Sequence, residues 1–300
     1  MLLLSAYQFI DLDALPLKQA EMRVQAKRLG LIGTVLIAPE GINFSLGGPK
    51  EALDGWMDYL AKAHGIDGLM VNWQPVDTVP FLRLRIRIRP EIITFDPDVL
   101  PHAQETAEHV DPKRWHELIQ DPNVQLVDTR NRNECEVGSF VGAQDPAIEK
   151  FSEFRDWSIS SLDPNRPVAM FCTGGVRCEK AGAYMKQHGF KTVYQLEGGI
   201  LNYLRSIEAD ESLWSGECFV FDDRISVDHH LKPTDKGICA GCRNPVDGLD
   251  EGNLPPWDEA GCCGICAQTF PPEKIAGIRE RIRQMALARE RGERHLGPKL

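Results

Sequence analysis

The sequence predicts a multidomain protein of mixed α/β and α+β class. We expect a small N-terminal βαββαβ domain, a central α/β domain with a parallel sheet, and a short cysteine-rich C-terminal segment. Three observations predict this organisation. Residues 82–89 alternate strictly between apolar and basic, residues 167–188 read as strand, glycine loop and helix, and two C-x-x-C pairs lie near the C-terminus. A chain of 300 residues is long enough for two or three such domains.

The N-terminal domain is expected over residues 1–92. Its predicted elements, in order, are a strand at 2–10, a helix at 16–29 that ends at Gly30, strands 34–38 and 42–46 joined by a Pro39-Glu40-Gly41 turn, a helix with Leu53, Trp56, Met57 and Leu60 on one face, and a strand at 82–89. The order βαββαβ is the ferredoxin-like arrangement, in which both helices cover one face of an antiparallel sheet and leave the other face free.

Four arginines share one face of the last strand of this domain. Alternate side chains of a strand point to opposite faces, so the apolar residues face the core and the other face carries Arg83, Arg85, Arg87 and Arg89. Guanidinium groups pair well with phosphates, and like charges this close repel one another unless an anion meets them. We expect this arginine row to contact the RNA backbone. The alternative is a solvated face neutralised by nearby acids.

Residues 93–110 are expected to form a linker, because their prolines and scattered acids show little periodicity. The central domain is expected over residues 111–212 and begins with a short helix at 111–119. Within this domain, residues 167–171 form an apolar run that is typical of a buried parallel strand, and residues 179–188 have a helical apolar face that ends at Gly189.

The segment between that strand and that helix is Cys172-Thr173-Gly174-Gly175-Val176-Arg177-Cys178. The backbone N–H groups of a loop that opens a helix can converge on the Cys172 sulfur, with the positive end of the helix dipole behind them. With the Arg177 cation nearby, they are expected to lower the thiol pKa from about 8.5 by one to several units. The loop therefore predicts a nucleophilic thiolate. The alternative is an inert cysteine buried in a tight turn.

With four residues between Cys172 and Arg177, this loop resembles the active-site loop of rhodanese-type sulfurtransferases. Residues 124–130 (VQLVDTR), with Glu134 after them, resemble the strand and turn that open a rhodanese domain, and residues 193–200 (VYQLEGGI) resemble a later strand and its glycine turn. The resemblance implies that Cys172 is the active-site residue and that Asp128 and Arg130 support it. A related phosphatase loop is one residue longer, so the loop here implies a small occupant such as a sulfur atom.

The C-terminal segment, residues 213–300, contains two C-x-x-C knuckles with zinc-ribbon spacing, formed by Cys239, Cys242, Cys263 and Cys266. Four soft thiolates favour zinc or iron, and four protein ligands leave no open coordination position. We therefore predict a structural zinc site. The alternatives are a redox dithiol pair or an empty cluster, and the adjacent Cys262 is a second candidate for the third ligand.

A basic helix and tail are expected after the cysteines, over residues 274–299, with Arg279, Arg281, Arg283, Arg289, Arg291 and Arg294. This segment is either a solvated terminal helix or a second RNA contact. The net charge of −10 argues against indiscriminate nucleic-acid binding, although a local basic surface can still serve one chosen RNA. Nine cysteines and an apolar start that Asp11 interrupts, without a basic leader, predict a cytoplasmic protein with neither signal peptide nor membrane span.

Taken in order, the motifs resemble those of the bacterial tRNA uridine(34) hydroxylases. They are the βαββαβ domain, residues 171–181 (FCTGGVRCEKA), residues 214–222 (WSGECFVFD) and the paired knuckles. The resemblance implies an oxidoreductase that uses molecular oxygen to convert the wobble uridine of tRNA into 5-hydroxyuridine, with the anticodon stem-loop as partner. The chain shows no flavin or nicotinamide motif and no 2-His-1-carboxylate set.

One chemical hypothesis fits a thiolate of low pKa: Cys172 adds to C6 of uracil and makes C5 electron-rich. A Cys172 persulfide or sulfenic acid is the competing intermediate, and Cys178 is the candidate resolving thiol for either. Two other functions stay open at this point. One is a sulfurtransferase that carries a Cys172 persulfide, and the other is a non-catalytic RNA-binding adaptor.

Overall fold

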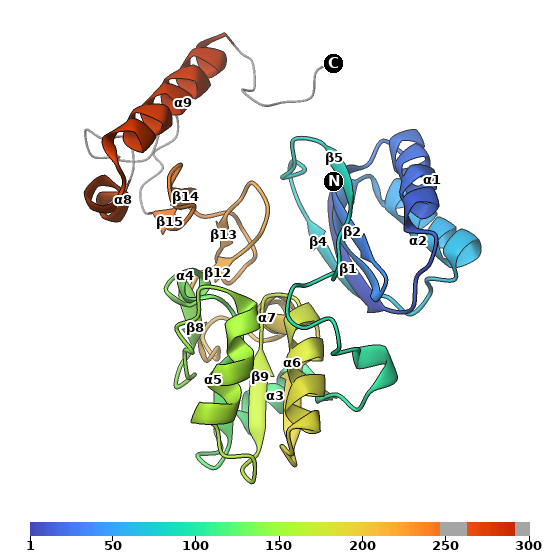
Figure 1. The fold of residues 1–300 in the computed structure, drawn as a ribbon, viewed down its shortest axis with the longest axis vertical. Coiled ribbons are helices and arrows are strands. Elements are labelled where there is room, and N and C mark those ends of the chain that lie inside the picture. The colour runs from blue at the N-terminus through green and yellow to red at the C-terminus, as the bar shows by residue number, and fades with distance from the viewer. Residues whose placement is uncertain (247–262, 292–300) are drawn as a thin grey trace.

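The computed structural model describes residues 1–246 and 263–291. Figure 1 shows an N-terminal domain beside the upper end of a central domain, and a C-terminal segment that contains a long helix. The predicted fold class is confirmed: the chain combines an α+β domain, an α/β domain with a parallel sheet and a small cysteine-rich segment.

The N-terminal domain has five strands and two helices among the described residues. Their order is β1 (Leu2–Phe9), α1 (Leu15–Arg28), β2 (Ile32–Ala38), β3 (Gly41–Gly48), α2 (Lys50–His64), β4 (Met70–Pro75) and β5 (Leu84–Ile88). Both helices pack on the same face of the sheet, where Leu53, Trp56 and Leu60 of α2 are fully buried as their spacing predicts. Gly65 ends α2 in the left-handed conformation that glycine adopts at little cost.

The strand at 82–89 was expected to be the fourth strand, and this expectation is wrong. The sheet order is β4-β1-β3-β2-β5, so β4 completes the βαββαβ unit and β5 is an extra edge strand, parallel to β2. The sequence does not predict β4, because two of its buried positions hold the polar residues Asn72 and Gln74 instead of apolar ones. Their partners are Arg205 and Arg224 from outside the domain, which no local pattern can show.

The second face of this sheet was expected to be free, and it is partly covered. Tyr7, Asn72 and Gln74 lie on the face opposite the helices and bond to residues beyond the domain. A fully buried lysine of the central domain, Lys180, also pairs with Glu40 from the β2–β3 turn at 2.7 Å. The sheet therefore docks on the central domain through hydrogen bonds and a buried ion pair.

The central domain is a parallel sheet of order β6-β10-β9-β7 with helices around it. Its elements are η1 (Pro101–Ala103), β6 (Glu108–Val110), α3 (Pro112–Leu118), β7 (Gln125–Asp128), α4 (Arg132–Cys135), β8 (Gly138–Phe140), η2 (Phe151–Glu153), α5 (Phe154–Ser161), β9 (Val168–Phe171), α6 (Val176–Gln187), β10 (Val193–Leu196) and α7 (Gly199–Ser206). Strand β9 is buried on both faces, since Met170 joins one apolar cluster and Phe171 the other. That burial fixes the point at which residue 172 leaves the sheet.

The predicted linker at 93–110 is partly wrong, because its last three residues are strand β6, which pairs with β10. Phe95 and Val99 of the same stretch are buried in the central core. A strand of three residues is too short for alternation to be recognised from sequence.

The C-terminal segment begins with short strands: β11 (Trp214–Gly216), which pairs with β8, the hairpin of β12 (Cys218–Phe219) and β13 (Ser226–Val227), and the pair β14 (Gly237–Ile238) and β15 (Pro245–Val246). Helices α8 (Gly264–Thr269) and α9 (Pro272–Glu290) follow. Over 1–246 and 263–291, no helix combines the length and the apolar character that a membrane span requires.

Candidate active site

The loop after β9 is shaped by close contacts with the start of α7. The backbone N–H of Ile200 donates to the Cys172 carbonyl at 3.0 Å, and that of Leu201 to the Thr173 carbonyl at 3.2 Å. Gly199, with φ +67°, lies so close that a Cβ there would be 2.5 Å from the Cys172 oxygen. Only glycine fits this close approach, which explains Gly199. The two hydrogen bonds from the start of α7 fix the backbone of Cys172 and Thr173.

Cys172 is 1% exposed, and its sulfur receives several hydrogen bonds. The Gly175 N–H donates to it at 3.1 Å, and the Arg177 N–H and the Cys178 thiol also donate. Burial alone would raise the pKa of Cys172. The Cys178 hydrogen bond, the Arg177 charge and the backbone N–H groups outweigh burial and lower that pKa to about 5. The group is therefore a thiolate at neutral pH.

The guanidinium of Arg177 is directed at Glu134, to which its two terminal nitrogens donate at 2.7 Å each. Both side chains are buried. Glu134 lies in α4, where its carboxylate also accepts from the Asn131 N–H at the start of that helix. Arg177 thus stabilises the thiolate through its charge and its backbone N–H, while Glu134 fixes the guanidinium. The sequence showed Glu134 only as part of a resemblance and gave it no role.

Cys178 behaves in the opposite way to Cys172. Burial, followed by the neighbouring Cys172 sulfur, raises its pKa well above the usual value, so it keeps its proton. Its sulfur lies 3.7 Å from the Thr129 hydroxyl, which comes from the strand end beside β9. The loop therefore holds one thiolate and one thiol in contact, and Thr173, Gly174 and Val176 complete the turn between them.

Asp128 and Arg130 lie underneath the loop. Arg130 is fully buried, donates to Asp128 at 2.9 and 2.6 Å and to the Gly138 carbonyl, and lies over the rings of Phe171 and Trp214. The pair ties the end of β7 to β8 and to the residue before Cys172. Its place is that of a support for the loop, without contact to the sulfur in any hydrogen bond of the described chain.

A second group beside the loop escaped the sequence argument because it comes from distant parts of the chain. Tyr7 of β1 donates its hydroxyl to Glu179 at 2.9 Å, and Glu179 also pairs with His109 at 3.2 Å. That hydrogen bond raises the pKa of His109, and burial raises the pKa of Tyr7. A Cβ at Gly175 would lie 2.8 Å from the Tyr7 hydroxyl, so the N-terminal domain lies directly against the loop of residues 172–178.

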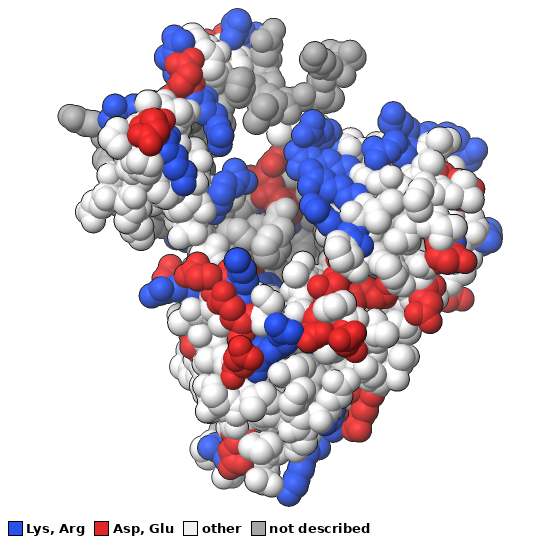
Figure 2. Space-filling model, in the orientation of Figure 1, with Lys and Arg blue, Asp and Glu red and all other residues white. Residues whose placement is uncertain are grey.

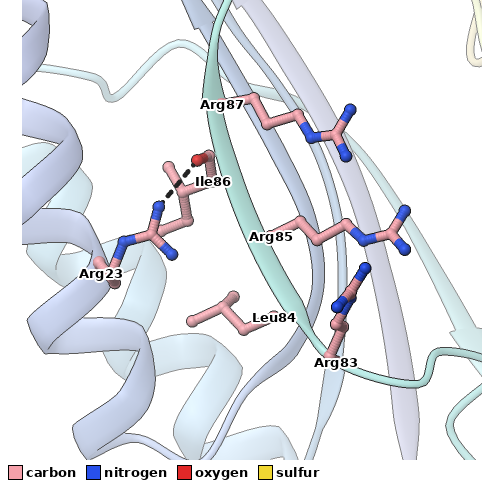
Figure 3. Close-up of a pocket in the computed structure, with 6 residues that line it drawn as sticks. All are labelled: Arg23, Arg83, Leu84, Arg85, Ile86 and Arg87. Carbon is pink, nitrogen blue, oxygen red and sulfur yellow. Dashed lines mark hydrogen bonds between the residues drawn. The ribbon is translucent and has the colours of Figure 1, made fainter. Parts of the chain in front are cut away.

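The arginine row lies on the same sheet face as Tyr7. In the strand registers, Arg87 is opposite Leu36, Leu36 is opposite Asn43, and Asn43 is opposite Tyr7. Paired residues point to the same side of a sheet. Figure 3 shows Arg83, Arg85 and Arg87 projecting from β5 away from α1, whose Arg23 reaches the Ile86 carbonyl on the other side. Arg89, just beyond β5, is also exposed.

The four predicted knuckle cysteines converge. Their sulfurs lie within 4.8 Å of one another, with 3.8 Å between Cys239 and Cys266 and 3.7 Å between Cys242 and Cys263. Tetrahedral ligands about 2.3 Å from a zinc ion are about 3.8 Å apart, so these distances fit one metal ion. Cys262, the alternative ligand, lies outside the described residues, as does Arg294 of the predicted tail.

Comparison with known proteins gives matches for both large domains and for the whole chain. A family model described as the UPF0176 acylphosphatase like domain matches residues 1–92, and the rhodanese-like domain model matches residues 111–206. A curated protein of Rhizobium leguminosarum bv. trifolii, named tRNA uridine(34) hydroxylase, is 39% identical over 298 residues, which cover 99% of this chain and 96% of that protein.

Two solved structures illustrate the partial matches. The rhodanese-like domain of an Anabaena protein is 23% identical, with a TM-score of 0.31, and the match covers 36% of this chain and 78% of that one. Acylphosphatase from Bacillus subtilis is 14% identical, with a TM-score of 0.25, and the match covers 29% of this chain and 99% of that one.

Proposed function

The chain belongs to the tRNA uridine(34) hydroxylase family, and we propose from this premise that it hydroxylates the wobble uridine of tRNA at C5. One observation carries the proposal beyond the similarity of sequence. The Cys172 thiolate is held in a loop that touches Tyr7, and the sheet face that carries Tyr7 also carries the arginine row. We therefore propose that the reactive thiolate and the arginine row serve the same bound tRNA.

The arginine row supplies the contact with the tRNA backbone. Three strand spacings of about 4.8 Å separate β5 from β1, so the row begins roughly 14 Å across the sheet from Tyr7. That separation allows the anticodon arm to lie along β5 while one nucleotide reaches the loop. Figure 2 shows basic side chains gathered over the edge of the N-terminal domain that is turned toward the C-terminal segment, where basic and acidic side chains are interspersed.

The thiolate supplies the nucleophile. When the Cys172 sulfur adds to C6 of uracil, a C–S bond forms and the electron pair of the C5=C6 bond moves to C5, as nucleophilic catalysis requires. The electron-rich C5 then attacks molecular oxygen and, with one proton, becomes a C5 hydroperoxide. Loss of the C5 proton and departure of the Cys172 thiolate restore the double bond.

The two loop cysteines also supply the two electrons that reduce the second oxygen atom to water. The Cys172 thiolate attacks the distal oxygen of the hydroperoxide, which releases 5-hydroxyuridine and leaves a sulfenic acid, and Cys178 then displaces water to form a disulfide. The sum is uridine, oxygen and two thiols giving 5-hydroxyuridine, water and one disulfide. An external dithiol reduces that disulfide for the next cycle. Cys178 keeps its proton while Cys172 is a thiolate, and oxidation of Cys172 to the sulfenic acid removes that neighbouring charge. The Cys178 proton then leaves with the departing hydroxide as water.

We assign the cysteine cluster to a structural zinc ion held by Cys239, Cys242, Cys263 and Cys266. Bound there, the ion crosslinks the two knuckles and neutralises thiolates. The four sulfurs fill a tetrahedral shell, so the residues of this segment act by positioning α8 and α9.

Purified protein, tRNA that lacks the modification and a dithiol reductant test this function. Under oxygen labelled with the heavy isotope, mass analysis of the wobble nucleoside is expected to show 5-hydroxyuridine that carries one labelled atom. Cys172→Ala is expected to reduce its formation by about three orders of magnitude or more, as loss of a nucleophile does. Cys135→Ala, a thiol in α4 outside the loop, is the matched control.

Three outcomes would contradict the proposal. Wild-type amounts of 5-hydroxyuridine from Cys172→Ala would show that Cys172 is not the nucleophile. A thiolated base, together with turnover of thiosulfate and cyanide, would show a sulfurtransferase. Tight tRNA binding with an unchanged nucleoside would show an adaptor.

A further inference from the structure

A short hairpin beyond the central sheet lies next to the loop and joins the two domains. It consists of β12, β13 and the residues between them, and Figure 1 shows these strands at the end of the central domain nearest the N-terminal domain. Its turn is held by the Asp223 N–H, which donates to the Pro80 carbonyl at 3.0 Å, and by Arg224, which donates to Gln74 at 2.9 Å. Both contacts reach the N-terminal domain, so the position of the turn is fixed between the domains.

Phe221 stands out in this turn because its side chain faces solvent. It is 69% exposed, whereas its neighbours Phe219 and Val220 are 5% and 3% exposed. Among the large apolar side chains that are exposed in the described parts of the chain, it is the aromatic one. An exposed phenyl ring costs hydrophobic free energy, and the fixed turn shows that the exposure is built into the fold.

The ring is also held at the reactive loop. The Arg177 guanidinium carbon lies 5.7 Å from the ring centroid of Phe221, and Arg177 is itself fixed by two hydrogen bonds to Glu134. The buried Phe219 ring meets Phe221 edge-on at 5.2 Å. Arg177 therefore lies between the two features, since its backbone N–H reaches the Cys172 sulfur while its guanidinium reaches the ring.

We propose that Phe221 is the surface on which the reacting base stacks, so that it holds the flipped-out pyrimidine of nucleotide 34 over the Cys172 loop. The proposal rests on the proposed function and identifies how the target base is placed. A base taken out of its own stack needs a flat apolar partner, and a phenyl ring supplies one for any base. The arginine row then binds the backbone, while Phe221 positions the base.

Binding of two anticodon stem-loops tests the proposal in a cycle: one carries uridine at position 34, and the other is identical but abasic there. In wild-type protein, removal of the base is expected to weaken binding roughly 5- to 100-fold, the range for one stacked base. Phe221→Ala is expected to lose the same factor on the uridine loop and almost nothing on the abasic loop. Phe221→Trp keeps the stacking surface and is expected to bind both loops as the wild type does.

A merely structural role gives a different result, because a displaced hairpin weakens both stem-loops equally; that result would overturn the proposal. Ile159→Ala, an exposed apolar residue of α5, is the matched control and is expected to change neither affinity. The failure of the proposed function looks different again. In that case the wild type itself forms no 5-hydroxyuridine. A wild type that forms 5-hydroxyuridine but binds both loops equally, or a Phe221→Ala variant without a selective defect, would instead overturn the role of Phe221.

Discussion

Cysteine sulfurs meet at two places in this protein, and the two places solve opposite electrostatic problems. In the loop, Cys172 and Cys178 are in contact but unlike: one has its pKa lowered to about 5, and the other has its pKa raised well above the usual value. In the C-terminal cluster, four sulfurs lie within 4.8 Å of one another, with 3.8 Å between Cys239 and Cys266 and 3.7 Å between Cys242 and Cys263.

The difference shows what the chain can neutralise by itself. One thiolate is satisfied by two backbone N–H groups, a thiol and an arginine, all supplied by residues 172–178. Four thiolates around one point carry too much charge for such donors and require a cation. The residues of the loop therefore stabilise one reactive thiolate by themselves, whereas the proposed function of the cluster is to hold a structural metal ion.

Removal of metal is the largest expected effect. Structural zinc contributes about 10–16 kcal/mol of apparent binding free energy in zinc-finger peptides, which is comparable to the whole stability of a domain. In the full-length protein, a strong chelator is expected to release one zinc ion and to abolish hydrogen-exchange protection in β14, β15 and α8. The loop is expected to keep its protection and its thiolate.

Cys242→Ser is expected to have the same effect on those elements, with Cys135→Ser as the control that retains the metal. Loss of protection in β9 and α6 on chelation would show that the two sulfur sites depend on one another. An unchanged C-terminal segment after complete metal loss would show that the cluster folds without a cation.

Lys180→Met tests the buried ion pairs between α6 and the N-terminal domain. Lys180 is fully buried next to Arg177 in α6, and it pairs with Glu40 at 2.7 Å and with Glu91 at 2.5 Å. Its removal leaves two buried carboxylates unpaired, so we expect the free energy of unfolding to fall by about 3–5 kcal/mol. Denaturant unfolding measures this loss.

The loss is expected to depend on pH. Burial already raises the pKa of Glu40, and a carboxyl whose folded pKa is raised destabilises the fold as the pH rises and it ionises. The deficit of Lys180→Met is therefore expected to shrink at acidic pH. Lys62→Met, an exposed lysine of α2, is the control. An equal deficit for Lys180→Met across the pH range would mean that lost packing, not unpaired charge, causes it.

Both sulfur sites could be predicted from the sequence because each is specified by local spacing. A C-x-x-C knuckle brings its own two cysteines together, and zinc-ribbon spacing indicates that two knuckles share one ion. A glycine loop that opens a helix likewise places its own cysteine at the start of that helix. The stripe of Leu53, Trp56 and Leu60 in α2 was predictable for the same reason, since one helix period decides it.

The missed features all depend on contacts between distant segments. Strand β4 was missed because its buried positions hold Asn72 and Gln74. Their side-chain oxygens accept hydrogen bonds from Arg205 and Arg224, which lie outside the domain. Tyr7 reaches Glu179 across 172 residues, and Phe221 of the C-terminal segment meets Arg177. The periodicity of one segment does not predict which distant segment it contacts. The sequence therefore does not predict the domain interface at the loop.

The smallest expected effect is a shift in the pKa of Cys172. Alkylation of Cys172 by iodoacetamide, followed by peptide mass analysis, is expected to have a midpoint at about pH 5 in wild-type protein. Arg177→Met removes the neighbouring cation and is expected to raise the midpoint by about one to three units. Arg177→Lys keeps the charge and is expected to shift it less.

Arg177→Met also leaves Glu134 as an unpaired buried carboxylate, which could disturb the loop by itself. The double variant Arg177→Met/Glu134→Gln removes that charge, so a midpoint that stays high in the double variant assigns the shift to the lost cation. A midpoint that returns to about 5 would instead show that the N–H groups hold the thiolate alone.

The pH dependence of the free energy of unfolding gives an independent check. Because the folded pKa lies below the unfolded value of about 8.5, ionised Cys172 adds stability that is complete above that pH and is lost as the pH falls toward 5. The stability that wild type has over Cys172→Ala is therefore expected to increase as the pH rises from about 5 to about 8.5. It is expected to increase less when Arg177 is methionine.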